Sequence, residues 1–204
     1  MFLFVNPQAG VRVTASSIWV GVEHLPIEAL RQAARHPRPV FCGRLAACDA
    51  RRDAVEVVRR AGTWPGGEPE WHEAEIGTTI GQGAVLDLLR QRWPVEEVIL
   101  VQPQWQADLG SDSGLGTTAE ESAYAREVLD GLLVVTRGAA ASLDTDVGSG
   151  MRVLVPKQSA CDTPLVAGLS ALVDQFIVIE AENWAARGMS LRCETLSSAL
   201  NETF

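Results

Sequence analysis

The stretch TPLVAGLSALVDQFIVIEAENWAARG, residues 163–188, predicts one long helix between two strands. Thr163 and Pro164 are the residue types of a helix N-cap and of a first helical position. Arg187 and Gly188 end it, because a cation in the last turn followed by glycine is typical of a helix C-terminus. A strand-like run precedes the helix at residues 151–155, and another follows it at 189–193.

Chain length, composition and net charge limit the classes of protein to which this chain can belong. A chain of 204 residues suits a single α/β domain, and 47% hydrophobic residues are too many for a disordered chain. A net charge of −9 argues against a nucleic-acid partner and against an anionic membrane surface. No apolar run reaches about 18 residues, and the first seven residues lack a basic segment. We therefore expect a cytoplasmic protein without a membrane partner.

Cysteines and histidines show no metal-binding or redox spacing. The chain has four of the first and three of the second: Cys42, Cys48, Cys161, Cys193, His24, His36 and His72. No C-x-x-C or Cys/His pattern can be written among them. We expect reduced core thiols, unspecialised histidines and no metal.

Strand-like and helix-like segments alternate along the rest of the chain. In order they are a strand at 2–5, a helix at 26–36, a strand at 39–42, a helix at 50–62, a strand at 71–76, a helix at 78–92, a strand at 95–101 and a helix at 118–143. Residues 13–22 fit a strand or a helix. This alternation predicts one Rossmann-like α/β domain over residues 1–204, with a mostly parallel sheet and helices on both faces.

The order of elements over residues 39–193, closed by the A-x-R-G turn at 185–188, resembles the short-chain dehydrogenases/reductases. The resemblance implies a fold that is truncated at its C-terminal end, because residues 194–204 leave no room for the family's substrate-covering loop and last strand.

The family binds a nicotinamide dinucleotide at a glycine-rich loop after its first strand. The loop after residues 2–5 carries Asn6, Gly10 and Arg12, and Gly10 is the only glycine among the first 20 residues. No G-x-x-x-G-x-G pattern exists there. We therefore expect this loop to be degenerate and the chain to carry no cofactor.

The resemblance also implies a tyrosine as general acid/base, a lysine four residues later and a serine that orients the carbonyl. Counting back from Arg187 and Gly188 places Val166 at the tyrosine and Ser170 at the lysine. Gln158 is nearest to the serine position, and Ser159 lies one residue away.

Two further residues complete the catalytic comparison. Asp130 takes the place of the asparagine that holds a water in the family. The only tyrosine of the chain, Tyr124, is followed four residues later by Val128, so no Y-x-x-x-K motif exists. We therefore expect no catalytic residues and a catalytically inactive pseudoenzyme.

The long helix predicts an interface. Its apolar residues cover more than one face, which indicates burial on more than one side. In the resembled family this helix and the preceding one pack against the same pair of a neighbouring subunit. The residues expected at such an interface are Leu132, Val135, Leu165, Leu169, Leu172 and Phe176. The plainer interpretation is a helix covered by its own chain.

The sequence thus predicts a non-catalytic subunit of a hetero-oligomer. Its partner would be an active short-chain alcohol dehydrogenase or ketoreductase, with a CoA- or carrier-bound hydroxyacyl or ketoacyl substrate. One alternative is a divergent NAD(P)-dependent oxidoreductase that uses Ser159 or Asp130. Another is a ligand-binding, regulatory homodimer.

Overall fold

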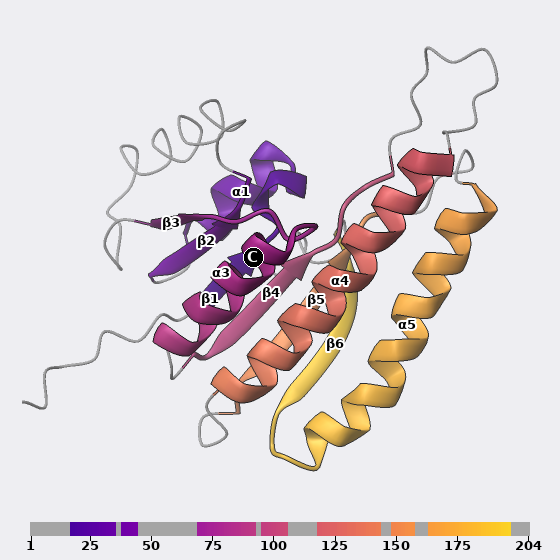
Figure 1. The fold of residues 1–204 in the computed structure, drawn as a ribbon. Helices are drawn as coiled ribbons and strands as arrows, with labels where there is room; N and C mark the ends of the chain where they lie inside the picture. The colour runs from indigo at the N-terminus through magenta and orange to yellow at the C-terminus, as the bar shows by residue number, and fades with distance from the viewer. Residues whose placement is uncertain are drawn as a thin grey trace, which may run out of the picture.

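The computed structural model describes residues 17–35, 38–44, 69–92, 95–105, 118–143, 148–157 and 163–196. Its centre is a six-stranded sheet in the order β3-β2-β1-β4-β5-β6, and every neighbouring pair is parallel (Figure 1). The strands are β1 Ser17–Val20, β2 Pro39–Gly43, β3 Glu70–Glu73, β4 Glu97–Val101, β5 Gly150–Val155 and β6 Ser190–Thr195. The predicted Rossmann-like α/β fold is confirmed.

Helices cover both faces of this sheet. In Figure 1, α3, α4 and α5 lie side by side on one face, and α1 lies on the other. Their bounds are α1 Ile27–Ala33, α3 Thr79–Gln91, α4 Thr118–Ser142 and α5 Pro164–Ala185, with a 3-10 helix η1 Val22–His24 before α1. Parallel strands need such crossovers, which bury the sheet from both sides.

The four inner strands β1, β2, β4 and β5 each contribute to two hydrophobic cores because successive side chains point to opposite faces. In β1, Ile18 and Val20 join the core beneath α3, α4 and α5. Trp19 lies between them and packs with Phe41 and Ile99 in the core beneath α1. This explains the nearly continuous apolar runs of β1 and β4.

The position of the first strand corrects one expectation. The central strand, paired to both β2 and β4, is Ser17–Val20, inside the segment that fitted either a strand or a helix. The strand expected at residues 2–5 and the helix expected at 50–62 lie outside the described residues. The other predicted strands and helices are confirmed, with ends that differ by a few residues.

The long helix α5 begins and ends where its sequence predicts. The Thr163 hydroxyl accepts a hydrogen bond from the Val166 amide at 3.4 Å, and Pro164 is the first helical residue. Gly188 follows the last turn with φ of +79°, a left-handed conformation that glycine adopts without strain.

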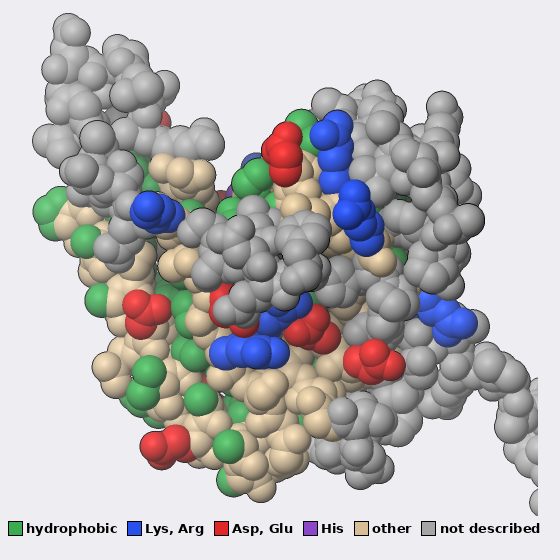
Figure 2. All heavy atoms as spheres, turned by 180° about the vertical axis from the view of Figure 1, so that it is seen from behind, with side chains coloured by type: hydrophobic (Ala, Val, Ile, Leu, Met, Phe, Trp, Pro, Cys, Tyr) green, Lys and Arg blue, Asp and Glu red, His purple; other side chains and the backbone are tan. Residues whose placement is uncertain are grey.

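An ion-pair ladder crosses the face of β4, β5 and β6 opposite to α4 and α5. Arg152 Nε lies 2.7 Å from Glu97 Oε1, and Arg152 Nη1 lies 3.6 Å from Glu194 Oε2. Arg192 extends the ladder, with Nε 3.4 Å from Glu194 Oε1. Figure 2, seen from behind, shows basic and acidic side chains next to one another on this side of the molecule. On this face of the sheet, β4, β5 and β6 therefore carry charged side chains, whereas the part of the same face next to α1 carries apolar ones.

Gly21 turns the chain sharply at the end of β1. Its φ is +80°, its amide donates to the Cys42 carbonyl at 2.9 Å, and a Cβ at this position would collide with the Val101 carbonyl oxygen. Both the backbone angle and the close approach to β4 require glycine.

We expect Gly21→Ala to lower the free energy of unfolding by roughly 1–3 kcal/mol, because alanine is strained at positive φ and collides with β4. Gly83→Ala is the matched control, since Gly83 is an exposed residue of α3 with open space around it. That change should raise the free energy by about 0.5–1 kcal/mol. Equal unfolding midpoints in urea for the two variants would contradict the assignment.

Candidate functional site

The carboxyl edge between β1 and β4 is the topological switch point of the sheet. The chain leaves β1 toward α1 on one face and leaves β4 toward α4 on the other. Open parallel sheets bind ligands in the crevice outside the strand ends at this point. The residues that line it here come from the loop after β1, the loop after β4 and the middle of α4.

In the structure, the place of the phosphate loop lies later in the chain than the sequence analysis expected. Residues 21–26 follow the central strand, so they occupy the place at which the fold holds a pyrophosphate. Asn6, Gly10 and Arg12 were expected to form that loop, and they lie outside the described residues. The correction arises because the pairing with β2 and β4, which defines the first strand, is not visible in the local sequence.

An acidic cluster fills the crevice. His24 Nε2 lies 3.2 Å from Glu127 Oε1 and 4.0 Å from Glu23 Oε1. Arg44, just after β2, reaches into the same cluster: its guanidinium lies 3.8 Å from Glu23, 3.4 Å from Glu75 and 3.4 Å from Glu127. Glu23 and Glu127 are mostly buried, with side chains 14% and 20% exposed.

The His24 hydrogen bond is the largest influence on the Glu127 carboxyl and lowers its pKa from the usual 4.5. The charges of His24 and Arg44 lower it further, and burial opposes both effects. Glu127 is therefore ionised at neutral pH.

A dinucleotide does not fit these residues. The cavity at the switch point has a volume of about 10 Å³, which is room for a single water molecule. A pyrophosphate would also lie against the carboxylates of Glu23 and Glu127, and repulsion between like charges opposes that arrangement. The described residues give this crevice the wrong size and the wrong charge for the cofactor.

A valine and a serine occupy the positions on α5 at which the resemblance implies a tyrosine and a lysine. Val166 is 3% exposed, and Ser170, one turn later, is half-buried. Leu169 and Val173 lie on the same inward face. The face of α5 at which the resemblance implies a tyrosine and a lysine is thus mainly apolar.

The other predicted site residues do not converge on that face. The Tyr124 hydroxyl donates to the Pro103 carbonyl at 3.3 Å, which ties α4 to the loop after β4. Asp130 accepts a hydrogen bond from Gln82 of α3 at 3.2 Å, on the side of α4 away from α5. Lys157 is exposed. Gln158 and Ser159 lie outside the described residues.

Solved structures of similar architecture can now be compared. The sequence matches no protein-family model and is similar to no curated protein. BdcA in complex with NADPH has a TM-score of 0.63 at 11% identity over 88% of this chain and 69% of that one. The landomycin C-6 ketoreductase LanV with NADP and rabelomycin has a TM-score of 0.65 at 12% identity over 89% and 76%.

A third structure, a putative dehydrogenase from Burkholderia cenocepacia with NADP, has a TM-score of 0.64 at 16% identity over 89% and 69%. Another neighbour is described as a short chain dehydrogenase/reductase family protein. The chain has a short-chain-dehydrogenase fold. At these identities the likeness establishes the fold, and function has to be argued from the residues of this chain.

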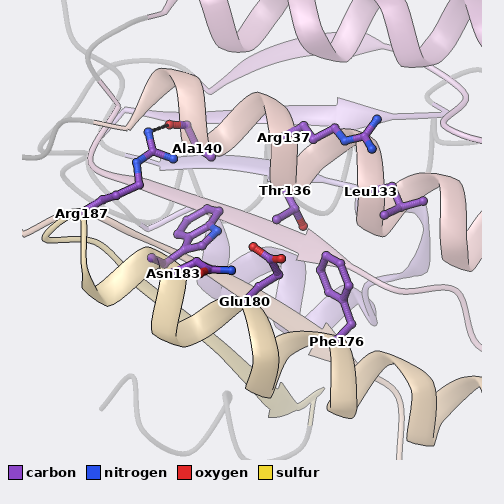
Figure 3. A pocket seen from close by; sticks show the side chains of 9 residues that line it. Leu133, Thr136, Arg137, Ala140, Phe176, Glu180, Asn183 and Arg187 are labelled. Carbon is purple, nitrogen blue, oxygen red and sulfur yellow. Dashed lines mark hydrogen bonds between the residues drawn. The ribbon is translucent and has the colours of Figure 1, made fainter.

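In this short-chain-dehydrogenase fold, α4 and α5 enclose a groove of about 240 Å³ between them (Figure 3). Thr136 and Glu180 point toward each other across it, and Phe176 borders one end. Arg187 closes the other end by donating to the Ala140 carbonyl at 2.7 Å. The Thr136 hydroxyl, buried in this wall, has no partner among the described residues.

The structure divides the predicted interface residues into two sets. Leu132, Val135 and Leu169 are 1%, 0% and 7% exposed, inside the chain's own core, which corrects their expected place on a surface. Leu165 and Leu172 are 39% and 47% exposed, and Phe176 borders the groove. The outer face of α5 is completed by Val178 and Ile179, at 63% and 57%.

Sequence reasoning missed the switch-point cluster. His24 and Glu127 are separated by 103 positions, and Arg44 comes from a third segment. Neighbours that only the fold brings together leave no spacing signal in the sequence. The placement of His24 on the first loop would have been the one available clue.

We expect slow alkylation of Cys42 and Cys193 in the folded protein. Burial, helped by the charge of Glu23, raises the pKa of Cys42 to about 12, and burial together with Asp174 raises that of Cys193 to about 12. At pH 8 only roughly 1 in 10,000 of such thiols is ionised, against roughly a quarter of free cysteines. Iodoacetamide labelling, read peptide by peptide, should be at least a hundredfold slower than in denaturant; equal rates would contradict the burial.

The ionised Glu127 carboxylate should stabilise the fold, with an effect that depends on pH. Its folded pKa lies below its unfolded pKa, so the stabilisation is present above the unfolded value and is lost as pH falls through the folded value. Glu127→Gln should therefore cost about 1–3 kcal/mol at pH 7, and this difference should shrink toward pH 3. Urea unfolding at both pH values measures it, and a difference that grows in acid would refute the assignment.

Proposed function

We propose that this chain is a non-catalytic subunit with a short-chain-dehydrogenase fold that binds an active short-chain alcohol dehydrogenase or ketoreductase. The contact surface is the outer face of α5 together with the adjoining face of α4. The observation that carries the proposal is the exposure of the large apolar residues Leu165, Leu172, Val178 and Ile179 on one helix. Exposed apolar surface of this kind marks interaction sites in soluble proteins.

The shape of this surface supports a protein partner. Leu133 of α4, 40% exposed, extends the apolar face of α5 across the groove. The small residues Ala167, Gly168 and Ala171 lie on the exposed side of α5 and allow another helix to approach closely. A flat pair of helices with a groove between them suits two helices from a second subunit.

Two features at the expected active site support the non-catalytic part of the proposal. Val166 and Ser170 cannot serve as the acid/base pair of a carbonyl reductase. The switch-point crevice has neither the room nor the charge for a nicotinamide dinucleotide. A divergent oxidoreductase would need both functions from residues at other positions.

We propose a reductase as the partner, and the dehydrogenases and the ketoreductase among the structures of similar fold support this choice. We propose further that this partner acts on a CoA- or carrier-bound hydroxyacyl or ketoacyl substrate. The chain's contribution would be to stabilise the active subunit or to shape its substrate site.

The composition of α5 also fits a membrane span by length and apolarity. Its buried residues Val173, Ile177 and Trp184 belong to the core that includes the sheet residues. A helix packed on the sheet in this way keeps its outer side exposed. We therefore assign that side to a protein surface.

Leu172→Glu should abolish binding to the partner, because a carboxylate at the centre of the apolar face would be buried without a counter-charge. The measurement is native mass of this chain co-expressed with an active short-chain dehydrogenase encoded beside it, together with reductase activity of the complex. We expect a mixed complex whose affinity falls at least a hundredfold in the variant.

Ile80→Glu is the matched control for this experiment. Ile80 is 88% exposed on α3, so the same chemical change falls outside the proposed surface and should leave the complex intact. A stable homo-oligomer that ignores the neighbour and dissociates on Leu172→Glu would replace the proposal with self-association. Partition of the wild-type chain into lipid vesicles would replace it with membrane binding.

A further inference from the structure

We propose that Glu23, His24 and Glu127 form a binding site for one divalent transition-metal ion, of the zinc or manganese kind, at the switch point of the sheet. The ion would occupy the crevice in which related folds hold a cofactor phosphate. This inference is independent of the partner proposed above.

The distances suit a metal ion. One ligand atom from each of the three side chains lies within 4.8 Å of the others, and His24 Nε2 is 3.2 Å from Glu127 and 4.0 Å from Glu23. Metal–ligand bonds of about 2.0–2.2 Å place ligand atoms roughly 3–4 Å apart. Small side-chain rotations would therefore bring all three around one ion, and the cavity has the room of about one water molecule.

The net negative charge of the cluster favours the binding of a cation. Three carboxylates, from Glu23, Glu75 and Glu127, face the single guanidinium of Arg44. A metal ion binds the neutral form of an imidazole, and the three carboxylates and one guanidinium then leave two negative charges uncompensated by the cluster itself. A divalent ion would compensate both.

A buried amide points to a ligand independently of the acidic cluster. Gln102 lines the same cavity and is 4% exposed, yet its Nε2 has no hydrogen-bond partner among the described residues. Buried polar groups are rarely left unpaired without a reason. Nε2 is a donor and cannot bind a cation, so metal binding would require a half-turn of the amide that presents Oε1 to the ion or to its water. Glu23, another residue of the cavity wall, has an Oε2 atom that is likewise buried without a hydrogen-bond partner among the described residues.

Arg44 is the competitor for the metal ion. Its side chain is 47% exposed, and its guanidinium contacts the same Glu127 oxygen as His24. Binding of the ion would move the guanidinium outward into solvent. This competition gives the site an unusual property, because removal of Arg44 should strengthen metal binding.

The donor set selects the class of metal. An imidazole nitrogen with two carboxylates suits zinc, manganese, iron or cobalt, whereas magnesium and calcium prefer oxygen ligands alone. We therefore expect Zn²⁺ to bind in the presence of excess Mg²⁺.

The test uses the full chain without a histidine tag, stripped with chelator and titrated with Zn²⁺ alone by calorimetry. We expect one equivalent to bind, a rise in the unfolding temperature and d–d absorption bands when Co²⁺ replaces Zn²⁺. His24→Ala and the shape-preserving Glu127→Gln should each weaken binding at least tenfold, and Arg44→Met should tighten it.

His72→Asn is the matched control. His72 Nε2 lies 2.7 Å from Glu70 at the outer edge of the sheet, a second histidine–carboxylate pair outside the proposed site. Its loss should leave Zn²⁺ affinity unchanged. Absence of saturable binding, equal losses in the His24 and His72 variants, or weaker binding in Arg44→Met would each overturn the metal site. Displacement of Zn²⁺ by equimolar Mg²⁺ would overturn the role of the imidazole.

Discussion

The close approach of Gly21 to the Val101 carbonyl governs the arrangement of the whole carboxyl edge. It allows β1 to pair with β4 up to its last residue and still turn at once toward η1 and α1. Glu23 and His24 are thereby held over the strand ends, where α4 brings Glu127 against them. A longer or more open loop would leave the crevice free for a phosphate. The tight turn closes it with side chains of the chain itself.

Elements with strong local signals could be predicted from the sequence, and elements defined by pairing could not. The cap at Thr163, the proline after it and Gly188 mark α5 without any tertiary information. The central strand Ser17–Val20 has only four residues, and all are buried because strands flank it and helices cover both faces of the sheet. Nothing local distinguishes it from the run at residues 2–5, so the sequence could not indicate that the loop after the central strand begins at Gly21.

The interface prediction shows a second limit of the same kind. A helix that is apolar around its circumference has no amphipathic phase, so the sequence cannot indicate which side meets the sheet. The side that carries Leu169 turned inward, and the side that carries Leu172 turned outward. The site cluster was still harder to predict, since Arg44 follows β2 and Glu127 lies on α4, and only the fold brings these two side chains within 3.4 Å of each other. By contrast, the prediction that Val166 and Ser170 stand where the resemblance implies a tyrosine and a lysine needed only the residue types.

The ladder of Arg152, Glu194 and Arg192 has a consequence for the architecture of any assembly. A subunit with two adhesive faces can add neighbours on both sides and grow into a filament. Here the apolar patch lies on α5, and the other face of β5 and β6 carries the ion pairs of Arg152, Glu194 and Arg192. Association through α5, as proposed, would use the apolar side of these strands, and their charged side offers no matching apolar surface among the described residues. The proposed complex would then close after a single contact instead of propagating.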